Sequence, residues 1–181
     1  MMFLKPILFV LTLLSLPLVQ IELTNLKGQK IKIQQFDQYK ATVVWFLSPD
    51  CPLCQNYTLT IKKLQEKHGK QIRIIGIVSG KNSSIQEILN YQNEYQLTIN
   101  ILRDEEKKLS KLLNASITPE VFVFNQKQKL VYSGRIDNWA YAPGKKRTVI
   151  TQHELEDVLG KLCKNQDVTY FKTKAVGCFI E

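Results

Sequence analysis

Two cysteines, Cys51 and Cys54, lie two residues apart at a junction between two kinds of hydrophobic pattern. Residues 41–47 form an apolar run of the kind found in strands that are buried on both faces of a sheet. After Cys54, apolar side chains recur at helical spacing as far as Leu64. The dithiol therefore lies where a buried strand ends and a helix begins, which favours redox chemistry.

The start of a helix gives the two thiols different roles. A thiol at Cys51 is close to free backbone N–H groups and to the positive end of the helix dipole, which stabilise the thiolate. Pro52 suits the first helical position because it has no N–H group to leave unpaired. Cys54 lies one turn further on and is expected to be more buried. We therefore predict that Cys51 attacks a substrate and that Cys54 resolves the mixed disulfide.

A lone CxxC motif also fits half of a zinc site or an inert structural disulfide. A zinc site needs a second pair of ligands. The remaining candidates are Cys163, Cys178, His68 and His153, and none of them has the spacing of a zinc finger or ribbon. We therefore expect a redox dithiol with no metal and no organic cofactor.

Residues 7–19 are almost entirely apolar and follow a single positive charge at Lys5. This run suits a signal peptide better than a membrane span, which needs roughly twenty residues. No small-residue cleavage site follows it, so residues 1–20 are predicted to be a signal peptide or a short membrane anchor. Contact with a membrane is expected only if this segment is not cleaved. We expect an exported protein of the periplasm or cell envelope of a bacterium.

The formal net charge of +9 raises the question of nucleic acid binding. Such binding would place the basic residues on one face, with aromatic residues between them. Here the lysines are scattered, with the densest clusters at residues 62–63, 107–108 and 145–147. We interpret them as solvated surface and expect no nucleic acid partner.

Residues 21–165 are enough for one domain with a sizeable core. Residues 21–33 have the pattern of a hairpin, and the helical pattern between the apolar runs 41–47 and 72–78 predicts a βαβ unit. The whole order predicts an α/β fold with a central mixed β-sheet flanked by helices. An extended C-terminal tail, residues 166–181, is expected to follow the domain.

Pro119 stands two residues before the start of the apolar run 121–124. A proline at the head of a strand cannot donate to the sheet, which indicates a specific turn and predicts a cis bond between Thr118 and Pro119. The loop residue Trp139 is a candidate for lining a groove.

These features together resemble the thioredoxin-like redoxins of the peroxiredoxin superfamily, which includes alkyl hydroperoxide reductase and thiol-specific antioxidant proteins. The likeness rests on residues 46–54, on Thr118-Pro119 and on residues 134–137. It implies a thioredoxin-like fold in which a cis-proline faces the dithiol and shapes a substrate groove. We expect this groove to include Ser48, Pro52, Thr118 and Trp139.

The sequence also departs from the relatives it resembles. Asp50 stands where thioredoxins have a tryptophan. Ser48 matches the threonine or serine that precedes the peroxidatic cysteine of peroxiredoxins by three residues, but Val44 stands where those proteins have a proline. The chain therefore has one of these two residues of the peroxidatic site and lacks the other.

Three functions are considered for this chain. The first is an extracytoplasmic thiol–disulfide oxidoreductase, whose partner is a protein disulfide or an electron-donor thiol protein. The second is a thiol peroxidase, in which a small peroxide oxidises Cys51 to a sulfenic acid that Cys54 or Cys178 then captures. The third is a copper-handling module like the Sco proteins, although those have a CxxxC motif and a downstream histidine.

Two further expectations concern residues outside the motif. Glu120 is the nearest candidate for a proton acceptor to Cys54, and the alternative is a solvent-facing residue at a strand start. Cys163 and Cys178 are fifteen residues apart, close enough for a structural disulfide that would hold the tail on the domain. The rival is that Cys178 reaches the dithiol as a third redox cysteine.

Overall fold

The computed structural model of the protein describes residues 20–180. Apart from Gln20, the predicted export segment lies outside the described residues. No helix within the described range is long and apolar enough to cross a membrane.

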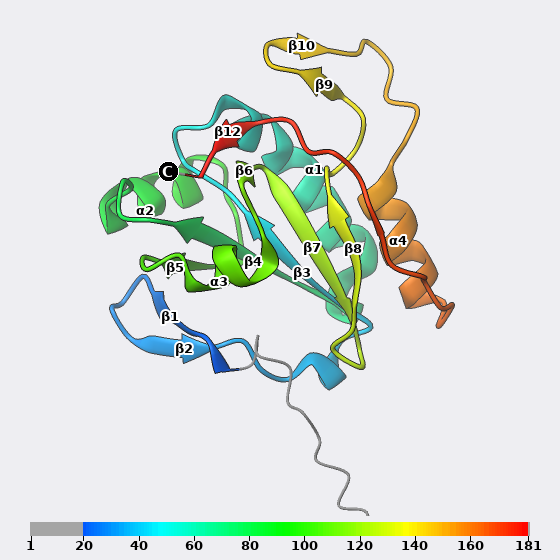
Figure 1. Cartoon of the computed structure of the whole chain (residues 1–181), viewed down its shortest axis with the longest axis horizontal. Helices are drawn as coiled ribbons and strands as arrows, with labels where there is room; N and C mark the ends of the chain where they lie inside the picture. Colours follow the sequence, from blue (N-terminus) through cyan, green and yellow to red (C-terminus); the bar gives the residue numbers. More distant parts are fainter. Residues whose placement is uncertain (1–19, 181) are drawn as a thin grey trace, which may run out of the picture.

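A central sheet organises the molecule, with the strand order β11-β8-β7-β3-β4-β5-β1-β2 (Figure 1). β3 runs parallel to β4, and β4 runs parallel to β5, whereas β7 is antiparallel to β3. The sheet is therefore mixed, as predicted. Every residue of β3 is buried, which places this strand at the centre. The strands are β1 (Glu22–Asn25), β2 (Lys30–Lys32), β3 (Ala41–Phe46), β4 (Ile72–Ser79), β5 (Asn100–Asp104), β7 (Glu120–Asn125), β8 (Leu130–Gly134) and β11 (Phe171–Lys172).

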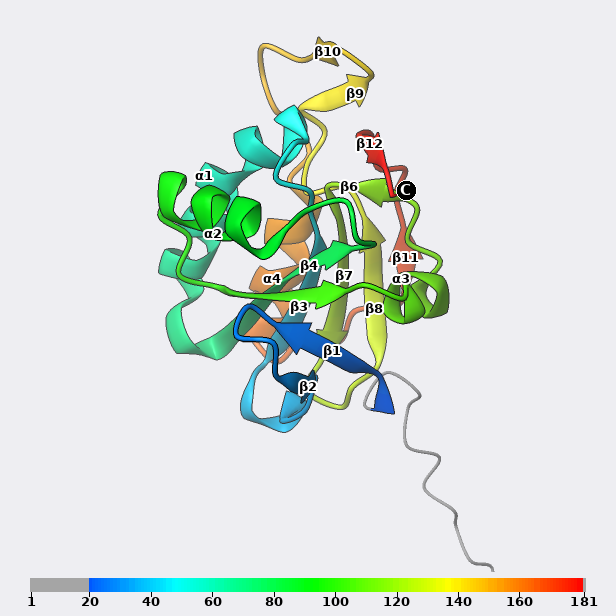
Figure 2. The same ribbon diagram turned by 90° about the vertical axis from the view of Figure 1, so that its left-hand side faces the viewer.

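Helices cover both faces of this sheet (Figure 2). One face carries α1 (Pro52–His68), α2 (Ile85–Glu94) and α4 (Glu154–Cys163), and the other carries η2 (Phe36–Gln38) and α3 (Lys108–Leu113). The short helix η3 (Gly69–Gln71) links α1 to β4. α2 begins with a capping box, in which the Ser84 side chain accepts from the Glu87 N–H and the Glu87 carboxylate accepts from the Ser84 N–H. The structure thus has the expected α/β architecture.

The alternation of side chains along the central strands divides the core in two. Trp45 and Val121 belong to the apolar cluster under α1, α2 and α4, together with both cysteines of the CxxC motif. Phe46 and Phe122 belong to the cluster on the opposite face. Neighbouring residues in a strand point to opposite faces of the sheet. Whether a side chain can reach the dithiol therefore depends on which face it points to.

The C-terminal tail crosses the sheet and does not stay near the helix that precedes it (Figure 1). β11 pairs in parallel with β8, and β12 (Cys178–Phe179) then pairs with β6 (Ile117–Thr118) in antiparallel fashion. The long loop after β8 forms a small hairpin of β9 (Ala140–Ala142) and β10 (Lys145–Lys146). The tail therefore ends at the loop that precedes Pro119.

Candidate active site

Cys51 is the residue immediately before helix α1, and Pro52 opens the helix as predicted. The Cys51 carbonyl accepts a hydrogen bond from the Gln55 N–H at 3.1 Å, which begins the helical ladder. Both cysteines are buried, with exposed fractions of 1% for Cys51 and 0% for Cys54. Access to the Cys51 sulfur therefore depends on what covers it.

The residue that covers Cys51 is Cys178, which forms a disulfide with it. Their Cα atoms are 6.1 Å apart, within the usual range for a disulfide. Cys54 and Cys163 are free thiols, so the predicted bridge between Cys163 and Cys178 is wrong. The physical reason is the direction of the tail, which continues from α4 along β8 and reaches the opposite end of the sheet.

The segment before Pro119 lies against both cysteines of this disulfide. The bond between Thr118 and Pro119 is cis, which confirms the prediction. The Thr118 carbonyl oxygen lies 3.2 Å from Cys51 Sγ, and the Thr118 hydroxyl donates to the Cys178 carbonyl at 3.5 Å. Thr118 is therefore the common neighbour of the dithiol and the tail.

Cys54 lies beneath the disulfide as a protonated thiol. Burial raises its pKa to about 12, and the smaller effects of the Ser48 N–H and of Thr118 lower it. The Ser48 N–H donates to Cys54 Sγ at 3.4 Å. Attack by Cys54 requires its thiolate, so its reactivity must rise steeply with pH.

Glu120 is separated from this thiol by the sheet. It pairs with Phe46 in the register of β7 and β3, and it shares a face with Phe122. Its carboxylate accepts from the Ser116 N–H at 3.4 Å, and burial raises its pKa. The geometry therefore gives no support to Glu120 as the proton acceptor of Cys54. The solvent-facing alternative is also wrong, because Glu120 is only 4% exposed.

A cavity of about 230 Å³ opens beside the disulfide. Ser48 and Thr118 lie on its wall, as expected for groove residues, whereas Pro52 and Trp139 lie outside its lining. Trp139 packs edge-on against Tyr57 of α1, with ring centroids 5.6 Å apart. Further residues line the cavity that were not predicted as groove residues, and they include Asp50, Asn82, Phe179 and Ile180. Asp50 could have been found from its place beside Cys51, but the two tail residues carry no local signal.

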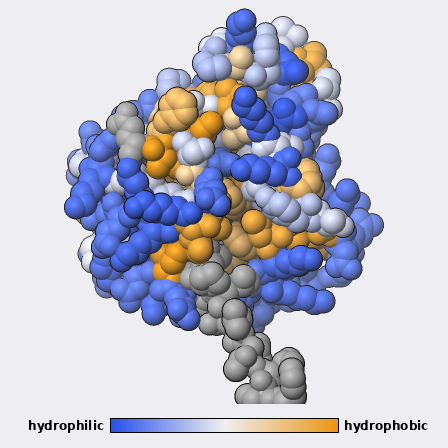
Figure 3. Space-filling model, in the orientation of Figure 1, coloured by the Kyte–Doolittle hydropathy of each residue, from blue (hydrophilic) through white to orange (hydrophobic). Residues whose placement is uncertain are grey.

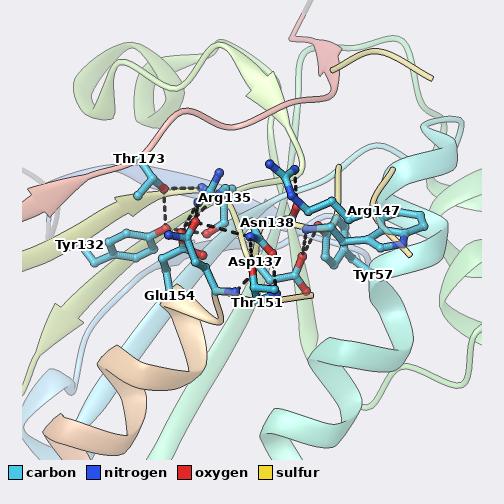
Figure 4. A network of polar contacts seen from close by, with 11 residues as sticks. Tyr57, Tyr132, Arg135, Asp137, Asn138, Arg147, Thr151, Glu154 and Thr173 are labelled. Carbon is cyan, nitrogen blue, oxygen red and sulfur yellow. Dashed lines mark hydrogen bonds and ion pairs between the residues drawn. The ribbon is translucent and has the colours of Figure 1, made fainter. Parts of the chain in front are cut away.

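Polar contacts hold α1 to the loop that follows β8 (Figure 4). The Tyr57 hydroxyl donates to Asp137 Oδ1 at 2.6 Å, and the Trp139 N–H donates to the same oxygen at 2.8 Å. Asp137 is 3% exposed. Its carboxylate is thus a buried acceptor that joins the dithiol helix to this loop.

The same loop fixes the start of the tail. The Arg135 N–H donates to Thr173 Oγ1 at 3.2 Å, and the Tyr132 hydroxyl lies 2.6 Å from that oxygen (Figure 4). The Arg135 side chain forms an ion pair with Glu154 at the beginning of α4. Residues 134–137, which carry part of the family resemblance, therefore anchor both the tail and α4.

The described part of the chain holds no group of three or more His, Cys, Asp or Glu side chains arranged to bind a metal ion. The two sulfurs of a CxxC motif could bind Cu(I), but here Cys51 is bonded to Cys178. The chemistry that this geometry supports is thiol–disulfide exchange.

Comparison with known proteins agrees with this geometry. The sequence matches the Redoxin family over residues 15–141, more than half of the chain. The chain belongs to the Redoxin family. A thioredoxin-like protein of Haemophilus influenzae is 25% identical to this redoxin over 121 residues, which are 66% of this chain and 70% of the relative.

Solved structures show the same fold. A hypothetical protein of Sinorhizobium meliloti 1021 superimposes with a TM-score of 0.76 at 22% identity, covering 88% of this redoxin and 89% of that chain. A secreted disulfide oxidoreductase of Mycobacterium tuberculosis, homologous to DsbE of E. coli, gives a TM-score of 0.57 at 14% identity, covering 83% of this redoxin and 99% of that chain. At these identities the likeness establishes the thioredoxin-like fold. Together with the family and the Cys51–Cys178 disulfide, it identifies the protein as a thioredoxin-like redox enzyme.

Proposed function

We propose that the protein is an extracytoplasmic thiol–disulfide oxidoreductase that acts on protein disulfides through Cys51 and Cys54. The observation that carries this proposal is that Cys51 is bonded to a cysteine on an extended strand, with that strand paired to the segment before Pro119. A site that binds one such strand is suited to binding a cysteine-containing segment of another protein. The predicted export segment supports a location outside the cytoplasm. The fold shared with the secreted disulfide oxidoreductase of M. tuberculosis supports it as well.

The chemistry proceeds in two exchanges. The Cys51 thiolate attacks one sulfur of the substrate disulfide, forms a mixed disulfide and releases the other substrate sulfur as a thiolate. Cys54, once deprotonated, attacks Cys51 Sγ, releases the second substrate thiol and leaves a Cys51–Cys54 disulfide. An electron-donor thiol protein returns this disulfide to the dithiol, or a disulfide-forming cycle runs the same steps in reverse.

Insulin reduction tests the proposal. Cys51→Ala should abolish the activity, and Cys54→Ala should leave a protein that accumulates mixed disulfides with its substrate. Cys163→Ala is the matched control, because Cys163 is a free thiol at the end of α4 and away from the site. Full activity in the Cys51→Ala protein would show that the oxidoreductase assignment is wrong.

A thiol peroxidase is the second candidate, and the Cys51–Cys178 bond is what favours it. A peroxide would oxidise the Cys51 thiolate to a sulfenic acid and leave as an alcohol or water. Attack by the Cys178 thiol on that sulfenic acid would form this same disulfide and release water. Peroxide consumption by the reduced protein, measured against Cys51→Ala, separates the two candidates.

A further inference from the structure

The tail lies in the site as an extended peptide. Cys178 is directly opposite Thr118 in the antiparallel pair of β12 and β6, and Phe179 is opposite Ile117. The Ile180 N–H continues the pairing by donating to the Ser116 carbonyl at 3.0 Å. Backbone groups thus align the tail, and this alignment brings the Cys178 sulfur to Cys51.

A glycine precedes Cys178 at the point of closest approach. A Cβ atom on Gly177 would lie 2.0 Å from the Thr118 carbonyl oxygen and 2.6 Å from its carbonyl carbon. No side chain fits in that space unless the strand moves. A strand can therefore pair with β6 in this position only if the residue before its cysteine is glycine.

A second glycine leaves room for the tail to pass close to the end of β8. Gly134 has a φ of +135°, and a Cβ atom there would lie 2.3 Å from the Thr173 carbonyl oxygen. Thr173 also accepts a hydrogen bond from the Arg135 N–H in the loop after β8. Residues 173–177 are thus held at both ends by close backbone contact.

Among the described residues of the tail, Ala175 is the one apolar side chain that is buried. Phe179 is 80% exposed, Tyr170 is 46% exposed and Phe171 is 39% exposed. Figure 3 shows hydrophobic surface interrupting the hydrophilic shell on the face that carries the tail. A segment with few buried apolar contacts opens locally at low cost. The tail is therefore held by its backbone pairing with β8 and β6 and by the covalent bond from Cys178 to Cys51.

From these contacts we infer that the tail is a tethered substrate of the site, with Cys178 as a third redox cysteine, an inference that rests on the proposed oxidoreductase function. The Cys54 thiolate attacks Cys51 Sγ, a Cys51–Cys54 disulfide forms, and Cys178 leaves as a thiolate that takes up the proton lost by Cys54. The exchange needs no external oxidant or reductant, because one disulfide replaces another. Release of the tail then uncovers β6 for a substrate strand.

The inference also names the substrate class. The strand that replaces the tail should be an extended, exposed protein segment with a Gly-Cys sequence, because Thr118 leaves no room for a side chain before the cysteine. The residue after the cysteine is unrestricted, since Phe179 at that position faces solvent.

Disulfide mapping tests the exchange on the full chain. Trypsin cleavage after Lys40, Lys62 and Lys174 places both cysteines of the motif in residues 41–62 and Cys178 in residues 175–181. The oxidised protein should give these two peptides linked, in equilibrium with residues 41–62 closed by an internal disulfide. Cys54→Ala should leave only the linked pair, and Cys178→Ser should leave only the internal disulfide.

The Gly177→Val variant tests whether glycine is required before Cys178. The ratio of linked to internally closed peptide should fall by about fivefold to 150-fold, which is an overpacking cost of about 1–3 kcal/mol at about 1.4 kcal/mol per factor of ten. Gly160→Ala is the matched control, because open space surrounds a Cβ at that position. An unchanged ratio in Gly177→Val, or a link from Cys178 to the peptide containing Cys163, would overturn the inference.

A peptide probe tests the substrate class. A synthetic peptide with the sequence of residues 175–181, supplied as its disulfide-linked dimer, should form a mixed disulfide with the Cys54→Ala, Cys178→Ser protein. The same peptide with valine in place of the glycine should give a yield lower by about tenfold or more. Equal yields would overturn the glycine requirement.

Activity separates failure of this inference from failure of the proposed function. If the tail competes with substrate, Cys178→Ser should reduce the disulfide-linked dimer of the residue 175–181 peptide faster than the wild-type protein does. A wild-type protein that is active and a Cys178→Ser protein that is inactive would overturn the tethered-substrate role. If wild type and Cys178→Ser are both inactive on this dimer and on insulin, the oxidoreductase proposal fails, while the mapping of the Cys51–Cys178 exchange still stands on its own.

Discussion

The hydroxyl of Tyr57 offers a quantitative test of how the dithiol helix is held. It donates to Asp137 Oδ1 at 2.6 Å, and burial raises its pKa well above the ordinary value of 10.0, so it stays protonated as a donor. Tyr57→Phe keeps the ring against Trp139 but removes one of the two donors to a buried carboxylate. A hydrogen bond to a charged group is worth roughly 1.5–3 kcal/mol, so the free energy of unfolding should fall by about 2 kcal/mol.

Urea unfolding of the oxidised protein, followed by circular dichroism, measures this loss. With a slope of about 2 kcal/mol per molar urea, the midpoint should fall by about 1 M. Tyr141→Phe is the control, because Tyr141 is 50% exposed and its substitution should change stability by less than about 0.5 kcal/mol. Equal midpoints for the two variants would refute the idea that this hydrogen bond anchors α1.

Three more predictions follow from the same geometry. Alkylation of Cys54 by iodoacetamide in the oxidised protein, measured by mass spectrometry, should be negligible at neutral pH and rise with pH toward the pKa of about 12; fast reaction at neutral pH would contradict its burial. Burial raises the pKa of Glu120 above its ordinary value of 4.5, so the native state loses stability as pH rises through that raised pKa. The stability of Glu120→Gln relative to wild type should therefore increase over the same rise in pH, and a constant difference in unfolding experiments would contradict this. Gly76→Ala would place a Cβ 2.9 Å from Leu47 Cδ2, so its thermal unfolding should reveal a loss of about 1–3 kcal/mol, and an unchanged midpoint would show that Leu47 moves freely.

The central part of the fold could be predicted because its signals are local. The continuous apolar run at residues 41–47 marks a strand buried on both faces, and the CxxC motif with its following helical pattern marks the start of α1. The cis bond before Pro119 followed from the position of a proline at a strand start and from its order after the dithiol. Each of these inferences needed only neighbouring residues.

The errors concern residues whose positions depend on distant pairing. Cys163 and Cys178 are close in sequence, which lowers the cost of closing a loop between them. The path of the tail is instead set by β11, two exposed residues with no pattern that sequence analysis can detect. For Glu120, the whole of residues 121–124 is apolar, so no alternation reveals which face the strand presents to the dithiol. The register with β3 decides this, and it is a property of the assembled sheet.

Thr118 shows why one short strand can serve both the tail and a substrate. Its carbonyl lies against Cys51, its hydroxyl donates to the backbone of Cys178, and it also contacts Cys54. The contacts of Thr118 with the tail are made to backbone atoms, which every extended strand offers. The site must therefore select a substrate strand by excluding side chains at one position. That position is Gly177, where the backbone approaches Thr118 most closely. A site that recognises backbone and rejects bulk at one position can exchange its own tail for another protein segment without changing any contact to Thr118.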